Sequence, residues 1–182
     1  MSKEISSKII GQLRQSDQFE DWWTSSPIAI PFLDNEKFPI TFMDFQPDHD
    51  ATFIHEADKA LKYFLELDLN YKKEISSYVY KNYQDFVGVA NDSGFSVVQI
   101  NNRDDIWQNI DITEIYVTRR PYNDKDIYIV LSGGCTWEEE HGIQLVFRQG
   151  KKLTRVSDND GHLTEADAYG KPDNEDELLS QF

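Results

Sequence analysis

The spacing of apolar residues changes twice along this chain, and this change constrains the fold more than any other feature. Apolar side chains alternate with other residues over 28–32 and again over 38–42. A period of two residues is typical of strands that bury one face. The polar residues 34–37 between these segments favour a turn, so the sequence predicts a β-hairpin here. Nearer the start, Ile5, Ile9 and Leu13 have helical spacing but Gly11 weakens a helix, which leaves that segment ambiguous.

The middle of the chain has the period of a helix instead. Apolar residues over 53–65 and over 75–86 recur at i, i+3 and i+4, so each segment presents an apolar stripe. Asp50 or Thr52 can cap the first predicted helix, and Asn70 can cap the second. Because each stripe must be buried, we expect a helical hairpin packed on one face of a sheet.

The period of two residues returns after residue 94. We expect further strands at residues 95–100, 112–118, 127–132, 142–148 and 153–156.

The pair Gln149-Gly150 between the last two of these strands is typical of a hairpin turn. The predicted fold is therefore α+β: a mostly antiparallel sheet with a helical hairpin packed on one face. Residues 1–172 form a single predicted domain, and the acidic residues 173–182 form a flexible C-terminal tail.

Charge and composition narrow the classes of function. The 182 residues include 33 acidic and 18 basic side chains, for a formal net charge of −15. Such a chain is poorly suited to direct nucleic-acid binding, which depends on Lys and Arg, and it has no apolar run long enough for a membrane span. The charge favours a basic protein partner, although acidity that serves only solubility explains it equally well. The single Cys135 cannot form an internal disulfide, so a cytoplasmic location is expected.

Histidines and carboxylates gather at the two ends of the last predicted hairpin. His141 precedes its first strand, and Asp158, Asp160 and His162 follow its second strand. Because a hairpin brings its outer ends together, these side chains could form a divalent-metal site or supply a general acid and base. Loops of this composition also occur for structural reasons, and no metal motif such as His-Glu-x-x-His is present. We therefore expect no cofactor, and a metal site formed by His141, Asp160 and His162 is the alternative.

Three other features bear on partner binding and catalysis. Glu138 and Glu139 are candidates for contact with a basic partner. Adjacent Trp22 and Trp23 would point to opposite faces of a strand, and an outward-facing tryptophan suits an interface. Cys135 lies close to three glutamates that oppose thiolate formation, which argues for a structural thiol rather than a nucleophile.

One stretch of the chain resembles a known family. Trp137, Glu140, His141 and Gly142 match a Trp-x-x-Glu-His-Gly element before a strand, and residues 160–163 match an Asp-Gly-His-Leu element after the next strand. The chain thereby resembles an uncharacterised bacterial family of unknown function. The resemblance implies that Trp137, Glu140, His141, Asp160 and His162 form one local unit.

Two hypotheses of function follow from these features. The resemblance and the charge together favour a non-enzymatic cytoplasmic interaction protein of bacteria, such as an immunity protein that binds a basic toxin or effector. A metal-binding or metal-dependent hydrolytic domain that uses the His/carboxylate cluster is the alternative.

Overall fold

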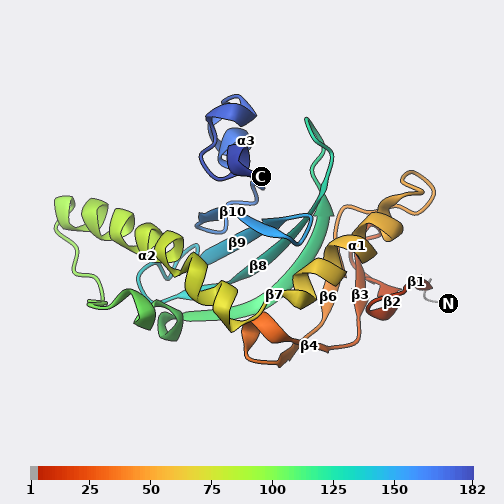
Figure 1. The fold of residues 1–182 in the computed structure, drawn as a ribbon, viewed down its shortest axis with the longest axis horizontal. Coiled ribbons are helices and arrows are strands. Elements are labelled where there is room, and N and C mark those ends of the chain that lie inside the picture. Colours follow the sequence, from red (N-terminus) through yellow and green to blue (C-terminus); the bar gives the residue numbers. More distant parts are fainter. Residues whose placement is uncertain (1–3) are drawn as a thin grey trace.

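The computed structural model describes residues 4–182, and a single twisted sheet forms its centre (Figure 1). Eight strands lie in the order β1-β2-β3-β6-β7-β8-β9-β10, with only β6 and β7 parallel among the paired neighbours. The bounds are β1 Glu4–Ser7, β2 Gly11–Gln15, β3 Trp23–Ser25, β6 Ile40–Phe42, β7 Ile110–Arg119, β8 Ile127–Cys135, β9 Ile143–Arg148 and β10 Lys152–Ser157. The prediction of a mixed fold with a mostly antiparallel sheet is thus confirmed.

The predicted hairpin near residue 35 exists, but it is smaller than expected. Strands β4 (Ile28–Ile30) and β5 (Glu36–Phe38) pair antiparallel in a separate two-stranded sheet. Pro31 begins a short 3-10 turn, η1 (Pro31–Leu33), and the left-handed Asp34 and Asn35 complete the reversal. Residues 40–42 leave this hairpin and enter the main sheet as β6.

The structure settles one segment that the sequence left ambiguous and corrects one predicted strand. The ambiguous N-terminal segment forms the β1–β2 hairpin. Residues 95–100, predicted as a strand, form none and are followed by the 3-10 helix η2 (Arg103–Asn109). The Tyr83 hydroxyl donates to the carbonyl of Val98 and accepts from the amide of Ile100, at 3.1 and 2.9 Å. A helix side chain thus takes backbone hydrogen bonds that a neighbouring strand would otherwise supply.

The two long helices lie where the apolar stripes predict them. They are α1 (Phe53–Glu66) and α2 (Leu69–Asp92). Asp68, rather than Asn70, caps α2 by accepting from the amides of Asn70 and Tyr71 at 2.9 and 3.1 Å. The expected helical hairpin is not confirmed, because α1 and α2 follow one another at an angle across the sheet (Figure 1). The short connection between them allows each helix to bury its own stripe.

The main core lies between the helices and one face of the sheet. Phe32 is fully buried, and its ring lies 6.5 Å from that of Phe64 on α1 and 5.6 Å from that of Phe147 on β9. Burial of each such side chain contributes about 1.5–3 kcal/mol. Alternate residues of β8 and β9, including Tyr128 and Val146, form a second small cluster on the opposite face of the sheet. The sheet is therefore covered on both faces near β8 and β9.

The C-terminal segment, defined as residues 164–182, packs against the β10 side of the molecule (Figure 1). It contains α3 (Glu165–Tyr169), η3 (Asp173–Glu175) and η4 (Leu179–Gln181). The sequence predicts a flexible tail over 173–182, whereas Asp176 and Leu179 are buried. The guanidinium of Arg120, only 1% exposed, explains why acidic residues fold back here, because a buried charge requires partners.

Arg120 binds this segment through paired hydrogen bonds. It donates to both carboxylate oxygens of Asp167 at 2.9 and 2.7 Å, and to both of Asp173 at 2.9 and 2.7 Å. A third carboxylate, that of Asp124, accepts at 2.8 Å. The planar guanidinium suits such two-point contacts.

Among the helices of residues 4–182, none combines the length and apolar composition needed to cross a lipid bilayer.

Candidate functional site

A groove lies between the C-terminal half of α2 and the turn that joins β8 to β9. Its volume is about 540 Å³. The residues that line it, called the acidic groove from here on, are Asn82, Asp85, Phe86, Val89, Trp137, Glu138, Glu140, His141, Gly142, Asp158 and Tyr169. Four of them are carboxylates and none is a lysine or arginine. The groove therefore combines apolar surface with negative charge.

The turn at residues 136–142 is held by its own side chains. The Glu138 carboxylate accepts from the backbone amides of Glu140 at 3.0 Å and His141 at 2.8 Å. It also lies 3.2 Å from the His141 imidazole nitrogen Nδ1. Glu138 is therefore occupied in shaping the turn, while the Glu140 side chain is 84% exposed and available to a partner.

The Trp-x-x-Glu-His-Gly and Asp-Gly-His-Leu elements are together called the sequence signature. Two residues of its first element fix this turn against the rest of the fold. The buried indole of Trp137 donates to Asn82 on α2 at 3.3 Å and packs edge-on against Tyr83 at 5.8 Å between ring centres. Gly142 has a φ of +68°, and a Cβ there would overlap the carbonyl oxygen of Gly133 on β8. Only glycine fits such a close approach of two backbones at positive φ. Trp137 and Gly142 thus hold the turn as a rigid wall of the groove.

The rim of the groove exposes large apolar side chains beside the carboxylates. Val89 on α2 is 68% exposed and Tyr169 at the end of α3 is 75% exposed. Both lie on the lining of the same groove as Glu140 and Asp158. Exposed aromatic and aliphatic side chains next to charged ones are found at protein interfaces.

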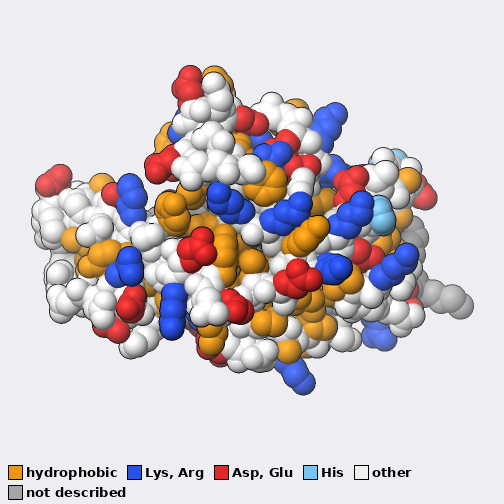
Figure 2. Space-filling model, viewed as in Figure 1, with side chains coloured by type: hydrophobic (Ala, Val, Ile, Leu, Met, Phe, Trp, Pro, Cys, Tyr) orange, Lys and Arg blue, Asp and Glu red, His pale blue; other side chains and the backbone are white. Residues whose placement is uncertain are grey.

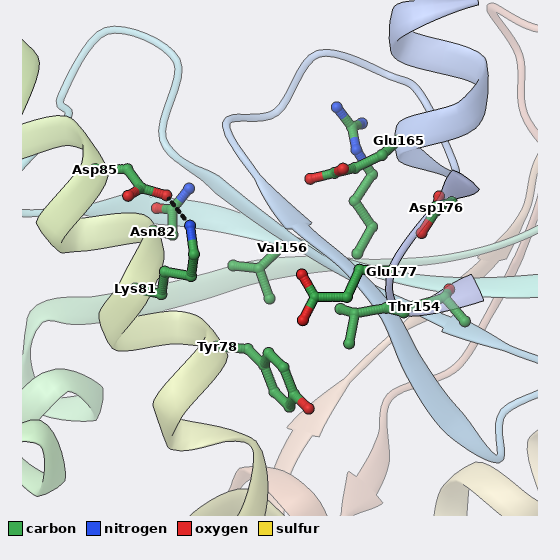
Figure 3. Close-up of a pocket in the computed structure, with 11 residues that line it drawn as sticks. Tyr78, Lys81, Asn82, Asp85, Thr154, Val156, Glu165, Asp176 and Glu177 are labelled. Carbon is green, nitrogen blue, oxygen red and sulfur yellow. Dashed lines mark hydrogen bonds and ion pairs between the residues drawn. The ribbon is translucent and has the colours of Figure 1, made fainter. Parts of the chain in front are cut away.

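A smaller hollow of about 110 Å³ adjoins the groove and shares Asn82 and Asp85 with it. Figure 3 shows this hollow between α2, β10 and the C-terminal segment, with the carboxylates of Glu165 and Glu177 at its sides. Lys81 points toward Asp85, and the two form an ion pair of 2.6 Å. The hollow thus carries both charges, because Lys81 and Arg155 line it together with its carboxylates.

The structure divides the predicted His/carboxylate cluster into two parts. His141 lines the acidic groove, whereas Asp160 forms a two-point ion pair with the buried Arg155, at 2.6 and 2.7 Å. The carbonyl oxygen of His162 accepts from Arg155 at 2.7 Å. Burial raises the pKa of Asp160, but the hydrogen bonds from Arg155 outweigh it, and the net pKa is lowered.

A metal site receives no support from this arrangement. Within residues 4–182, no three His, Cys, Asp or Glu side chains lie close enough together to hold a metal ion. The Asp-Gly-His-Leu element is instead tied to the neighbouring strand. The buried Gln144 amide donates to Asp160 at 3.1 Å and to the carbonyl of His162 at 2.8 Å, which links β9 to the Asp-Gly-His-Leu element.

The remaining candidates occupy different places. Burial raises the pKa of the Cys135 thiol to about 11, so the thiol is protonated at neutral pH. Trp23 is buried in the core and donates to the carbonyl of Phe45 at 3.0 Å. Trp22 lies between Phe19 and Tyr116 of β7, at 4.7 and 5.7 Å between ring centres, and does not line the groove. Glu139 does not line the groove.

Sequence reasoning missed half of the groove. Asp85 and Val89 on α2 and Tyr169 at the end of α3 were not singled out, whereas Asp158 belonged to the predicted His/carboxylate cluster. The apolar stripe of α2 could have placed Phe86 on the buried side, but no pattern shows which turn packs against the end of that helix. The tertiary contact between Trp137 and Asn82 brings the two walls together.

Comparison with known proteins gives one match. A family model described as a domain of unknown function (DUF6985) matches residues 9–163. Neither the curated proteins nor the solved structures contain a match to this chain. The matched range includes both α2 and the turn at 136–142, and it ends before Tyr169.

Proposed function

We propose that this chain, which belongs to the family described as a domain of unknown function (DUF6985), is an interaction protein that binds a basic segment of a partner protein in the acidic groove. The observation that carries the proposal is the composition of the groove. Its lining contains four carboxylates and exposed apolar surface, without a lysine or arginine. A partner segment with Lys or Arg beside apolar residues complements both properties.

The charged and apolar surfaces make different contributions. Each exposed ion pair stabilises a complex by only about 0.2–1 kcal/mol, so carboxylates such as Glu140 act mainly on the rate of association and on the choice of partner. The apolar surface of Val89 and Tyr169 adds binding energy in proportion to the area removed from water, about 25 cal/mol per Å². Affinity should therefore depend on both kinds of side chain.

The groove is already formed in the free protein, which favours binding. Trp137 ties the turn to α2, Glu138 binds its amides, and Gly142 sets its exit into β9. A wall that is fixed in this way loses little conformational entropy when a partner binds. The sequence signature thus has a physical role as the support of the binding surface.

The resemblance noted in the sequence suggests the biological setting. We propose a bacterial, cytoplasmic immunity protein whose partner is a basic toxin or effector. The formal net charge of −15 supports this choice, because it accelerates encounter with a positively charged protein. The rate increase should fall steeply as ionic strength rises.

A peptide of 12 residues that alternates arginine and leucine provides a direct probe of the groove. Calorimetric titration should show binding that weakens at least tenfold in Glu140→Lys/Asp158→Lys. The control Asp17→Lys/Glu20→Lys changes the charge equally at exposed residues outside the groove, and its affinity should change less than threefold. Equal weakening in the two double variants would mean that the peptide senses net charge only, and would contradict the proposal.

The apolar contribution needs its own variant. Val89→Ser leaves every charge in place and should weaken the same peptide about threefold or more. Circular dichroism should show an unchanged fold, because Val89 is exposed in the free protein. Unchanged affinity in Val89→Ser would remove the apolar part of the proposed contact.

A further inference from the structure

A second pocket lies at the other helix, and its charge is opposite to that of the acidic groove. It has a volume of about 500 Å³ and is formed by α1, the turn between β7 and β8, and the turn between β9 and β10. Figure 2 shows several Lys and Arg side chains over the part of the surface where α1 lies. The residues of this cationic pocket are Glu56, Lys59, Ala60, Tyr63, Arg119, Asp124, Lys125, Asp126, Ile127, Gln149 and Lys151.

The acidic residues of the cationic pocket are already paired with arginines. Glu56 binds Arg119 at 2.6 Å. Asp124 binds the buried Arg120 at 2.8 Å, and Asp126 binds Arg148 at 2.7 Å. Each carboxylate that lines the pocket is thus held by an arginine and not by one of the pocket's lysines.

Three lysines are left without a carboxylate. Within residues 4–182, no ion pair is found for Lys59, Lys125 or Lys151. Their ammonium groups come from three different elements and share one pocket. A pocket with three unpaired ammonium groups is suited to an anion.

The backbone holds these three elements in fixed positions. Gly150 has a φ of +65°, and a Cβ there would overlap the carbonyl oxygen of Ala60 on α1, so the β9–β10 turn lies directly against the helix. Arg119 donates to the carbonyl of Lys125 at 2.6 Å while its guanidinium also binds Glu56. The lysines therefore project from a rigid frame, which reduces the entropy lost on binding.

We infer that the cationic pocket binds a small organic anion that carries two or more phosphate groups. Lysine ammonium groups bind phosphate oxygens as point charges, and three of them match the charge of a diphosphate. The exposed ring of Tyr63, with the Lys151 ammonium 4.6 Å from its centre, offers a surface for the organic part. The volume falls within the usual range of small-molecule sites.

The net negative charge of the protein does not prevent this binding. At physiological ionic strength, interactions between exposed charges are screened beyond about 8 Å. The local charge of the pocket, rather than the distant carboxylates, then decides which ions enter. Lower ionic strength should strengthen the local attraction and the long-range repulsion together.

Calorimetric titration with pyrophosphate, in buffer without divalent metals, tests the inference. Binding to the wild-type protein should weaken at least tenfold in Lys59→Gln/Lys151→Gln. The control Lys37→Gln/Lys73→Gln removes the same charge from exposed lysines outside the pocket, and its affinity should change less than twofold. All four side chains are exposed, so thermal unfolding should confirm that both double variants fold.

Two results would overturn the inference. The first is the absence of any binding heat with pyrophosphate and with ATP at millimolar concentration. The second is an equal loss of affinity in the two double variants, which would mean that the anion senses only net charge. Tighter binding of ATP than of pyrophosphate would support the inference and assign the organic part to the surface beside Tyr63. This pocket and the acidic groove share no residue, so either proposal can fail without the other.

Discussion

Replacement of Arg120 by alanine should destabilise the fold more than replacement of any exposed arginine. The buried guanidinium binds Asp124, Asp167 and Asp173, whose side chains are 12%, 26% and 34% exposed. Breaking a buried ion pair costs about 3–5 kcal/mol because it leaves an uncompensated charge. Since these carboxylates can partly rehydrate, we expect the lower end, about 3 kcal/mol. For a chain of this length that loss lowers the melting temperature by about 6–12 °C.

Urea unfolding followed by circular dichroism measures this difference. Arg103→Ala is the matched control, because the Arg103–Asp104 pair is exposed and 3.6 Å long, and its loss should cost less than about 0.5 kcal/mol. Hydrogen bonds from Arg120 lower the pKa of Asp173, so their contribution is complete above pH 4 and is lost as the pH falls through the folded-state pKa. The difference between wild type and Arg120→Ala should therefore shrink at low pH. A cost within 1 kcal/mol of the control at pH 7 would refute the reasoning.

Three further predictions concern pH, backbone geometry and the thiol. Arg155 lowers the pKa of Asp160 despite burial, so the free energy of unfolding of the wild type, measured by urea titration, should decline as the pH falls below about 4. A free energy of unfolding that stays constant from pH 6 to 3 would contradict the ion pair between Arg155 and Asp160. Gly142→Ala should cost about 2 kcal/mol or more in the same assay, while Gly134→Ala, where an added Cβ meets nothing within 4 Å, should cost clearly less. Cys135 should react with an aromatic disulfide at pH 8 at least about 100 times more slowly in the native protein than in urea. The reason is that only about one thiol in a thousand is ionised at pH 8 when the pKa is about 11. Equal rates in the two conditions would refute the burial of the thiol.

The elements of this fold were predictable where one local pattern decides the structure. The apolar stripe of 53–65 gives α1 almost to the residue, and Gln149-Gly150 gives the β9–β10 turn, where both residues have positive φ. The segment 95–100 shows the limit of such patterns. Its spacing is strand-like, but the hydroxyls of Tyr80 and Tyr83 on α2 take up its backbone groups.

The candidate site was predictable only in part, for the same reason. The signature located one wall of the groove through Trp137 and His141, because those residues are contiguous in the sequence. The opposite wall lies about one third of the chain earlier, on α2. The alternative of a site shared by His141 and Asp160 could not be weighed from the sequence, because the buried Arg155 holds Asp160 and such competition for a carboxylate leaves no trace in residue spacing.

Affinity capture from native lysate tests the central claim most directly when the wild type is compared with Glu140→Lys/Asp158→Lys and with Asp17→Lys/Glu20→Lys. If the acidic groove binds the partner, the wild type and Asp17→Lys/Glu20→Lys should both retain one basic protein at low salt, and high salt should weaken that retention. Glu140→Lys/Asp158→Lys should lose the same protein. Mass spectrometry would identify that protein. Retention of the same proteins by all three would contradict a role for the groove in partner binding.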